Sequence, residues 1–151
     1  MQKILIIISS LFIFSSVLNA QKYDMSVGLR LGYPFGINAK MFLNEITAIE
    51  ATVLSDGNDL GVVGLMDFHQ PCKRNENWQW YYGAGAHLGL DIFDGQGISL
   101  GLDAIAGAEY IFKEAPISIS IDWIPSLNLI KPEKENVLNL MQFGLSARYI
   151  F

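Results

Sequence analysis

The sequence predicts an all-β protein, an eight-stranded antiparallel up-and-down β-barrel that follows an N-terminal signal peptide. Three observations support this fold class. Apolar residues alternate with small or polar residues along most of the chain after residue 20, which is the period-2 pattern of β-strands. Short segments rich in turn-forming residues separate eight such stretches. The only cysteine, Cys72, cannot form a disulfide within the chain, so strand pairing must stabilise the fold.

The first 20 residues have the features of a secretory signal peptide. Lys3 precedes the apolar stretch 4–18, and small residues lead up to a cleavage site between Ala20 and Gln21. An uncleaved membrane helix is the alternative, but four serines interrupt this stretch and a spanning helix needs about 20 apolar residues. We therefore expect cleavage, which leaves residues 21–151 as a single barrel domain.

The charge balance excludes some classes of partner. Removing the signal peptide takes away one charged residue, Lys3, and leaves nine basic against fifteen acidic side chains, a net charge of −6. Nucleic-acid-binding proteins concentrate Lys and Arg on one face to neutralise phosphates, and this chain has no such cluster. We expect no nucleic-acid partner.

Eight stretches carry the strand pattern. We expect strands at 24–33, 36–43, 46–54, 60–69, 79–92, 98–112, 117–125 and 141–151. The pattern is clearest in 98–112, where Leu100 and Leu102 share one face and Ser99 and Asp103 the other. Strands of about 9–11 residues can cross a bilayer when they are tilted, and an even number of strands is typical of bacterial barrels.

The composition of the two faces separates a soluble barrel from a membrane barrel. A soluble barrel has an apolar lumen and a polar exterior, whereas a membrane barrel reverses this arrangement. The non-apolar face of these strands is mostly Gly and Ser, which fit a narrow eight-stranded lumen but would form a poor aqueous surface. We therefore predict a transmembrane β-barrel whose apolar face contacts membrane lipid.

Aromatic residues near the strand ends support the same interpretation. With the N-terminus in the periplasm, the alternation predicts an aromatic girdle at both rims, formed by Trp80, Tyr82, Tyr110, Phe112 and Tyr149 at the periplasmic rim and Trp123 at the other. The alternative is a general preference of aromatic residues for strands, which predicts no clustering at strand ends.

Charged residues on the inward face need partners. The inward-facing charges are Arg30, Lys40, Glu50, Asp67, Asp91, Asp103, Glu109, Asp122 and Arg148. Buried charges persist only when they are paired or hydrated. We predict a lumen charge network of Arg30, Lys40, Glu50, Asp103, Glu109, Asp122 and Arg148, in which the three cations pair with Glu50, Glu109 and Asp122. Because side chains fill the interior of an eight-stranded barrel, we favour a structural plug over an ion path.

The remaining reactive residues do not form a recognisable site. His69 and His87 lie on different expected strands with no third ligand nearby in the sequence, so we predict no metal site. Cys72 lies beside Lys73 and Arg74, whose charges favour a thiolate, but we interpret it as an incidental turn residue. We expect no cofactor.

The ending Arg148-Tyr149-Ile150-Phe151 resembles the C-terminal assembly signal of bacterial outer-membrane proteins. The stretches GLRLGYPFGINAKMF, AIEATVL and WYYGAGAHLGL resemble small outer-membrane barrels of Bacteroidota-type bacteria, related in architecture to OmpA/OmpX and opacity-type proteins. This resemblance implies that the barrel-assembly machinery reads Tyr149 and Phe151. It also implies a location in the bacterial cell outer membrane, with outer-membrane lipid as a partner.

The resemblance covers proteins of several functions, because these barrels include anchors, adhesins, small channels and enzymes. Lipid A deacylases of this architecture use a His-x-Ser pair, but Gly89 follows His87 at the second position and Pro71 follows His69. We therefore expect a non-enzymatic barrel with an envelope-structural or surface-interaction role and a plugged lumen. A narrow porin-like channel for ions or small solutes is the second hypothesis, and a lipid-modifying enzyme is the third.

Overall fold

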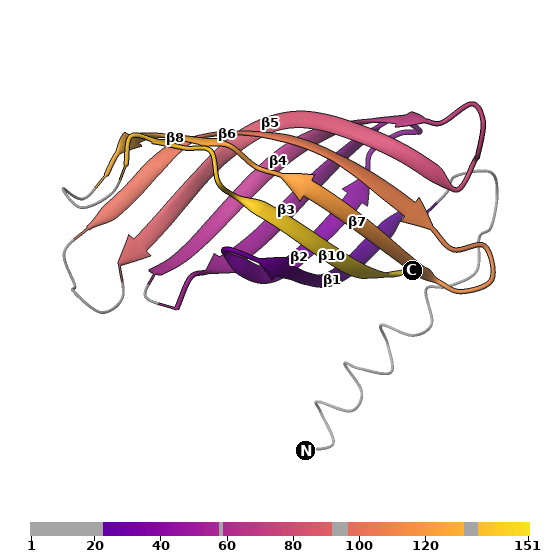
Figure 1. Ribbon diagram of the computed structural model, residues 1–151, viewed down its shortest axis with the longest axis horizontal. Coiled ribbons are helices and arrows are strands. Elements are labelled where there is room, and N and C mark those ends of the chain that lie inside the picture. Colours follow the sequence, from indigo (N-terminus) through magenta and orange to yellow (C-terminus); the bar gives the residue numbers. More distant parts are fainter. Residues whose placement is uncertain (1–22, 58, 92–96, 132–135) are drawn as a thin grey trace, which may run out of the picture.

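The computed structural model describes residues 23–57, 59–91, 97–131 and 136–151, which form a closed antiparallel β-barrel (Figure 1). The expected signal peptide, residues 1–20, lies outside the described residues, as does the side chain of Asp91. No helix in the described part of the chain is long and apolar enough to cross a membrane.

The strands follow the alternating stretches of the sequence. In chain order they are β1 (Met25–Gly32), β2 (Phe35–Phe42), β3 (Thr47–Ser55), β4 (Asp59–Pro71), β5 (Trp78–Asp91), β6 (Ile98–Ile111), β7 (Ile117–Trp123), β8 (Ser126–Ile130), β9 (Leu138–Asn139) and β10 (Phe143–Ile150). These ten strands occupy eight positions around the barrel, because β7 with β8 and β9 with β10 each share one position. The predicted eight-stranded antiparallel barrel is therefore confirmed.

The barrel closes between its first and last strands. Strands β1 to β6 pair with their neighbours in sequence, and β6 pairs with both β7 and β8. Strand β10 pairs with β7 on one side and with β1 on the other, from Ser26 opposite Ile150 to Gly32 opposite Gly144. Closure leaves no exposed sheet edge along this seam, which satisfies backbone groups that an open sheet would expose.

The seventh strand continues beyond its predicted end at Pro125. Proline has no backbone N–H and cannot donate a hydrogen bond to the neighbouring strand. The carbonyl of Pro125 nevertheless accepts a hydrogen bond from the backbone N–H of Ala104 at 3.0 Å, and pairing with β6 resumes in β8. The predicted last strand, 141–151, is also different, because β10 begins only at Phe143 and the short β9 precedes it.

The two faces of the strands differ as the alternation predicts. In β3 the side chains of Glu50 and Thr52 are buried in the lumen, whereas Ile49 and Val53 are exposed on the outside. Large apolar side chains are exposed on the outside of every long strand, and the inward side chains are mostly polar, charged or small. The described barrel is therefore apolar outside and polar inside.

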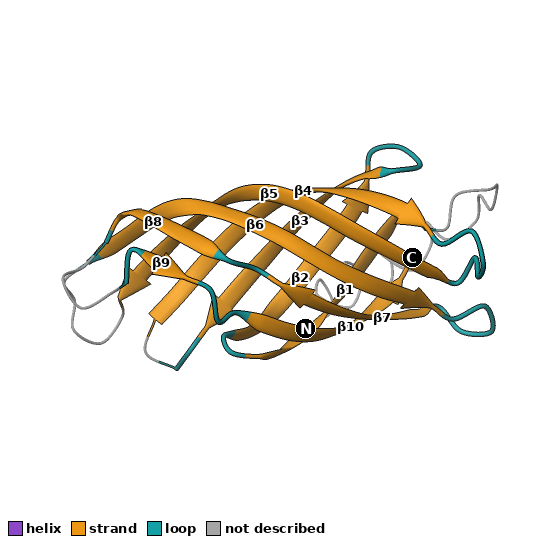
Figure 2. Cartoon of the chain, turned by 45° about the horizontal axis from the view of Figure 1, so that its top comes forward, coloured by secondary structure: helices purple, strands orange, loops and turns teal. Residues whose placement is uncertain are grey.

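The two ends of the barrel differ, and we call them the terminal end and the distal end (Figure 2). The terminal end carries the C-terminus, the start of β1 and the turns 43–46, 72–77 and 112–116. The distal end carries the ends of β1, β3, β5 and β8 and the starts of β2, β4, β6 and β9. Strands β4, β5 and β6 have 13, 14 and 14 residues against 8 in β1, so one side of the wall is much longer than the other.

Candidate functional site

A network of buried charges fills the half of the lumen nearer the terminal end. Arg148 of β10 lies 3.3 Å from a carboxylate oxygen of Glu50 and 3.4 Å from one of Glu109. The ammonium of Lys40 lies 2.9 Å from Glu50 and 3.0 Å from Asp67. These five residues are at most 3% exposed. Two cations therefore share three carboxylates in a space closed to solvent.

A second ion pair lies against the wall formed by β1, β7 and β10. The Arg30 Nη2 and Nε donate to one oxygen of Asp122 at 2.7 and 3.1 Å, and Nη1 donates to the carbonyl of Pro34 at 2.8 Å. A Cβ on Gly144 would lie 2.4 Å from the Arg30 guanidinium carbon. Glycine at this inward position leaves the space that the guanidinium occupies.

The carboxylate of Glu109 closes the terminal end. It accepts hydrogen bonds from the hydroxyl of Tyr23 at 3.0 Å, from the amide of Gln79 at 2.6 Å and from the hydroxyl of Ser118 at 2.6 Å. Tyr23 precedes β1 and is buried, so its ring covers the lumen beside the first strand. Charge-assisted hydrogen bonds of this kind are stronger than neutral ones, and they fix the carboxylate in place.

Six of the seven residues of the predicted charge network pair with one another, in two separate groups. Arg30 pairs with Asp122, Lys40 with Glu50, and Arg148 with Glu50 and Glu109. The assignment of Asp103 to this network needs correction, because Asp103 pairs with His87 instead. Strand alternation predicts that a side chain faces the lumen, but the tilt of the strands decides which side chains meet across it.

A buried apolar cluster lies next to the charges. It consists of Leu54, Val63, Leu65, Tyr81, Ile105 and Ile124. The ring of Tyr81 joins this cluster to the network, because the Lys40 ammonium lies 4.0 Å from the centre of the ring and His69 stacks on it. Leu54 and Val63 also line a cavity at the distal end. The cluster therefore extends from the Lys40 side of the charge network to this cavity.

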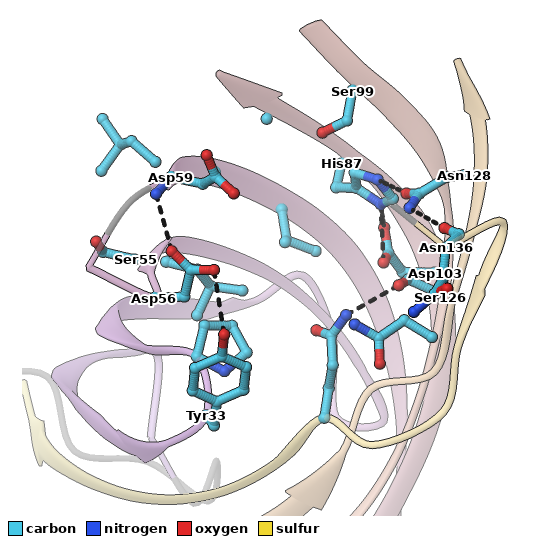
Figure 3. Close-up of a pocket in the computed structure, with 18 residues that line it drawn as sticks. Tyr33, Ser55, Asp56, Asp59, His87, Ser99, Asp103, Ser126, Asn128 and Asn136 are labelled. Carbon is cyan, nitrogen blue, oxygen red and sulfur yellow. Dashed lines mark hydrogen bonds and ion pairs between the residues drawn. The ribbon is translucent and has the colours of Figure 1, made fainter. Parts of the chain in front are cut away.

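The distal cavity is an open hollow with a volume of about 330 Å³ among β3, β4, β5, β6 and β8 (Figure 3). His87 from β5 lies at one side, with Nδ1 2.9 Å from Asp103 and Nε2 2.7 Å from the side-chain oxygen of Asn128. The amide of Asn128 donates to the carbonyl of Asn136 at 2.8 Å, which fixes its orientation. Both ring nitrogens of His87 therefore face oxygen acceptors.

The other side of the distal cavity is formed by turns. The Tyr33 hydroxyl donates to Asp56 at 3.3 Å, and the negative charge of this carboxylate raises the pKa of Tyr33 above its ordinary value. The second oxygen of Asp56 accepts from the backbone N–H of Asp59 at 2.8 Å.

Ser99 of β6, which is 8% exposed, also lines the cavity and has no hydrogen-bond partner among the described residues.

Sequence reasoning missed the contacts of His87. Asn128 was not expected on an inward face because the strand was predicted to end at Pro125. The contact with Asp103 could have been found from the sequence. The alternating patterns of β5 and β6 place His87 opposite Gly101, and Asp103 is the next inward residue along β6.

The aromatic residues singled out in the sequence lie on the outer surface near the terminal end, with one exception. Trp80 stacks with Tyr82, and Tyr110 contacts Phe112 edge to face. The sequence predicted Trp123 at the opposite rim of the barrel. It does not lie there, because β8 continues beyond it toward the distal end. It stacks on Phe143 at a centroid distance of 6.2 Å, opposite Ala106 in the middle of the longer β6.

The C-terminal residues are held by the first strand. Tyr149 is paired in β10, and its ring contacts that of Phe151 at 5.1 Å. The backbone N–H of Phe151 donates to the carbonyl of Met25 at 2.9 Å. The last residue is therefore fixed at the seam where the barrel closes.

The histidines and the cysteine do not converge. His69 lies 3.4 Å from Lys40 in the charge network, whereas His87 lines the distal cavity. Cys72 is free and exposed in the turn between β4 and β5. In the described part of the chain, no group of three or more His, Cys, Asp or Glu residues could hold a metal ion.

Comparison with known proteins adds no relative. No protein-family model matches this sequence, and no curated protein matches it.

Proposed function

We propose that this protein is a small, non-enzymatic barrel of the bacterial outer membrane with a structural or surface-interaction role and a lumen closed to ions. One observation carries the proposal: the closed barrel has an apolar outer face and a polar inner face. This is the reverse of a soluble barrel. The sequence features of residues 1–20 and the C-terminal Tyr149 and Phe151 agree with export and assembly in that membrane.

The outer face supports contact with lipid. Leu29, Ile37, Leu102 and Ile121 come from four different strands and are each more than half exposed. Soluble monomers rarely expose contiguous apolar patches larger than a few hundred Å². An apolar belt around the whole barrel would cause aggregation in water, whereas a bilayer would cover it.

The contents of the lumen support a closed barrel over a channel. A hydrated ion would have to displace the Lys40–Glu50 and Arg148–Glu50 contacts and pass the apolar cluster. The channel remains our second hypothesis. One observation favours it: buried polar atoms of Asp122, His69 and Tyr81 have no hydrogen-bond partner in the described protein, and water would satisfy them.

A lipid-modifying enzyme remains the third hypothesis. The pair of His87 and Asp103 has the base-and-carboxylate arrangement of hydrolases, but Nε2 of His87 faces the Asn128 oxygen and not a nucleophilic hydroxyl. No observation therefore favours this hypothesis over the first two.

Fractionation of cells that express the full chain tests the location. We expect the protein in the outer-membrane fraction, with a mature N-terminus at or within a residue or two of Gln21 by mass spectrometry. Vesicles reconstituted with the purified protein should not swell in solutions of small sugars. Recovery in the soluble fraction, or retention of residues 1–20, would contradict the membrane assignment, and swelling would favour the channel.

A further inference from the structure

We propose that the distal cavity is a binding site for a small polyhydroxylated ligand, a saccharide of about one sugar ring. The proposed structural role does not use this cavity, so the inference goes beyond that role. The cavity has a volume of about 330 Å³, which is near the lower end of the ~300–1,000 Å³ range of small-molecule sites. It therefore fits a compact polar ring better than a long chain or a folded peptide.

The described lining residues offer the mixture of donors and acceptors that sugar hydroxyls need. Asp56 and Asp59 supply carboxylates, and Asn139 and Gln142 supply planar amides. Asn139 accepts from the backbone N–H of Met141 at 3.2 Å, and the Gln142 amide donates to Ser126 at 2.9 Å. These contacts fix both amides and leave a second polar atom on each for a ligand.

Charge argues against an anionic ligand. Among the described lining residues, only His87 can carry a positive charge, and both of its ring nitrogens already face Asp103 and Asn128. The carboxylates of Asp56 and Asp59 add negative charge to the same cavity. A phosphate, sulfate or carboxylate would find no unpaired cation there, whereas a neutral sugar or an amino sugar would meet no such penalty.

Ser99 gives an independent indication of a ligand. Ser99 is 8% exposed as a residue, lines the cavity and lies near His87, as Figure 3 shows. It has no hydrogen-bond partner among the described residues, although buried polar groups are normally paired. A sugar hydroxyl in the cavity would supply the missing partner.

The ligand has two possible sources, a free sugar or the sugar headgroup of a glycolipid. A free sugar would enter from the distal end. The headgroup of a glycolipid would enter over the shorter side of the barrel wall. On this side β1 ends at Gly32, and β9 pairs only with β8 among the described strands. Apolar side chains are exposed along this side, including Met141 at 79% and Leu138 at 54%. Both sources present the same chemistry to the cavity.

The two histidines provide a direct test, because one lines the cavity and the other is buried in the charge network. The protein with ¹³C-labelled histidine, folded in detergent micelles, is titrated with glucose, glucosamine and N-acetylglucosamine, and with inorganic phosphate as the anionic comparison. A second arm uses nanodiscs with and without lipopolysaccharide. We expect saturable shifts of the His87 ring signals in at least one arm, unchanged His69 signals and no response to phosphate.

Gly61 and Gly64 provide matched variants on the same strand. Gly61 lines the cavity, and a Cβ there meets only the Leu88 carbonyl at 3.8 Å, so Gly61→Leu adds a side chain to the cavity from a position with room for its Cβ. Gly64 is exposed on the outer face with nothing within 4 Å of a Cβ, so Gly64→Leu is the control.

Loss of the His87 shift in Gly61→Leu and its retention in Gly64→Leu would support the site. A response to a free sugar would identify a soluble ligand, and a response only to lipopolysaccharide would identify a lipid-linked one. The proposal is overturned by the absence of a His87 shift in both arms, by an equal shift in Gly61→Leu, or by a stronger response to phosphate.

Discussion

The two halves of the lumen are built by the same strands but have opposite properties. In the terminal half, Arg148, Lys40 and Tyr81 cross the lumen and leave no solvent-exposed space around them. In the distal half, inward positions are occupied by small residues such as Gly89 and Ser99, and a cavity remains. The comparison shows that side-chain volume at inward positions decides whether an eight-stranded barrel is sealed or hollow.

The largest expected effect is in the sealed half. Glu50→Ala removes the carboxylate that contacts Lys40 at 2.9 Å and Arg148 at 3.3 Å. Breaking a buried pair typically costs ~3–5 kcal/mol, because it leaves uncompensated charge in a closed space. We expect a loss of this size in the free energy of unfolding, measured by urea titration in lipid vesicles.

The matched control for Glu50→Ala is Glu76→Ala. The Glu76 side chain is 87% exposed and lies 4.0 Å from Lys113, a surface pair that contributes little. Its loss should leave the unfolding curve unchanged. Equal effects of the two substitutions would mean that the charge network does not stabilise the barrel.

The next largest effect tests the outer face. Ala104 lies in the middle of β6 with its side chain outward. Arg at a lipid-facing midplane position costs about 2–4 kcal/mol of folding stability in a bilayer. Ala115→Arg, in a turn at the terminal end, should cost much less in the same unfolding measurement. Similar costs at the two positions would argue against a lipid-facing surface.

A pair of serines compares the two halves directly. Ser118 donates a 2.6 Å hydrogen bond to Glu109 in the sealed half, and hydrogen bonds to charged groups contribute about 1.5–3 kcal/mol. Ser118→Ala should therefore lower the free energy of unfolding by an amount in this range. Ser99→Ala should change it very little, because Ser99 has no partner among the described residues. The reverse order would show that the halves are not packed as described.

The smallest effect concerns the space around Tyr81. A Cβ on Gly107 would lie 2.5 Å from the Tyr81 ring and 2.7 Å from the Ile121 carbonyl. Overpacking of this kind costs about 1–3 kcal/mol, so Gly107→Ala should lower the midpoint of thermal unfolding in detergent. Gly64→Ala is the control, since nothing lies within 4 Å of its Cβ. A tolerated Gly107→Ala would indicate a looser lumen.

The sequence was sufficient for the six strands β1 to β6 and for the faces of the strands, because the period-2 pattern is a local property, whereas β8 and β9 were not predicted. The expected strand 98–112 differs from β6 by one residue at its end. Contacts across the lumen were only partly predictable. Charge complementarity predicted that Arg30, Lys40 and Arg148 pair with Glu50, Glu109 and Asp122, but not which cation contacts which carboxylate. The partner of Asp103 depends on strand register. The distal cavity could not be foreseen, because it depends on the continuation of β7 beyond Pro125.

The most direct test of the sealed lumen is the ion current through the protein in planar lipid bilayers. Wild-type protein and Glu50→Ala are compared under the same salt gradient, together with their unfolding midpoints. We predict no current for either protein and a clearly lower midpoint for the variant, because Glu50 holds Lys40 and Arg148 in a closed lumen. Unchanged stability together with an altered, cation-dependent current would contradict this account, since it would mean that Glu50 lines a hydrated channel.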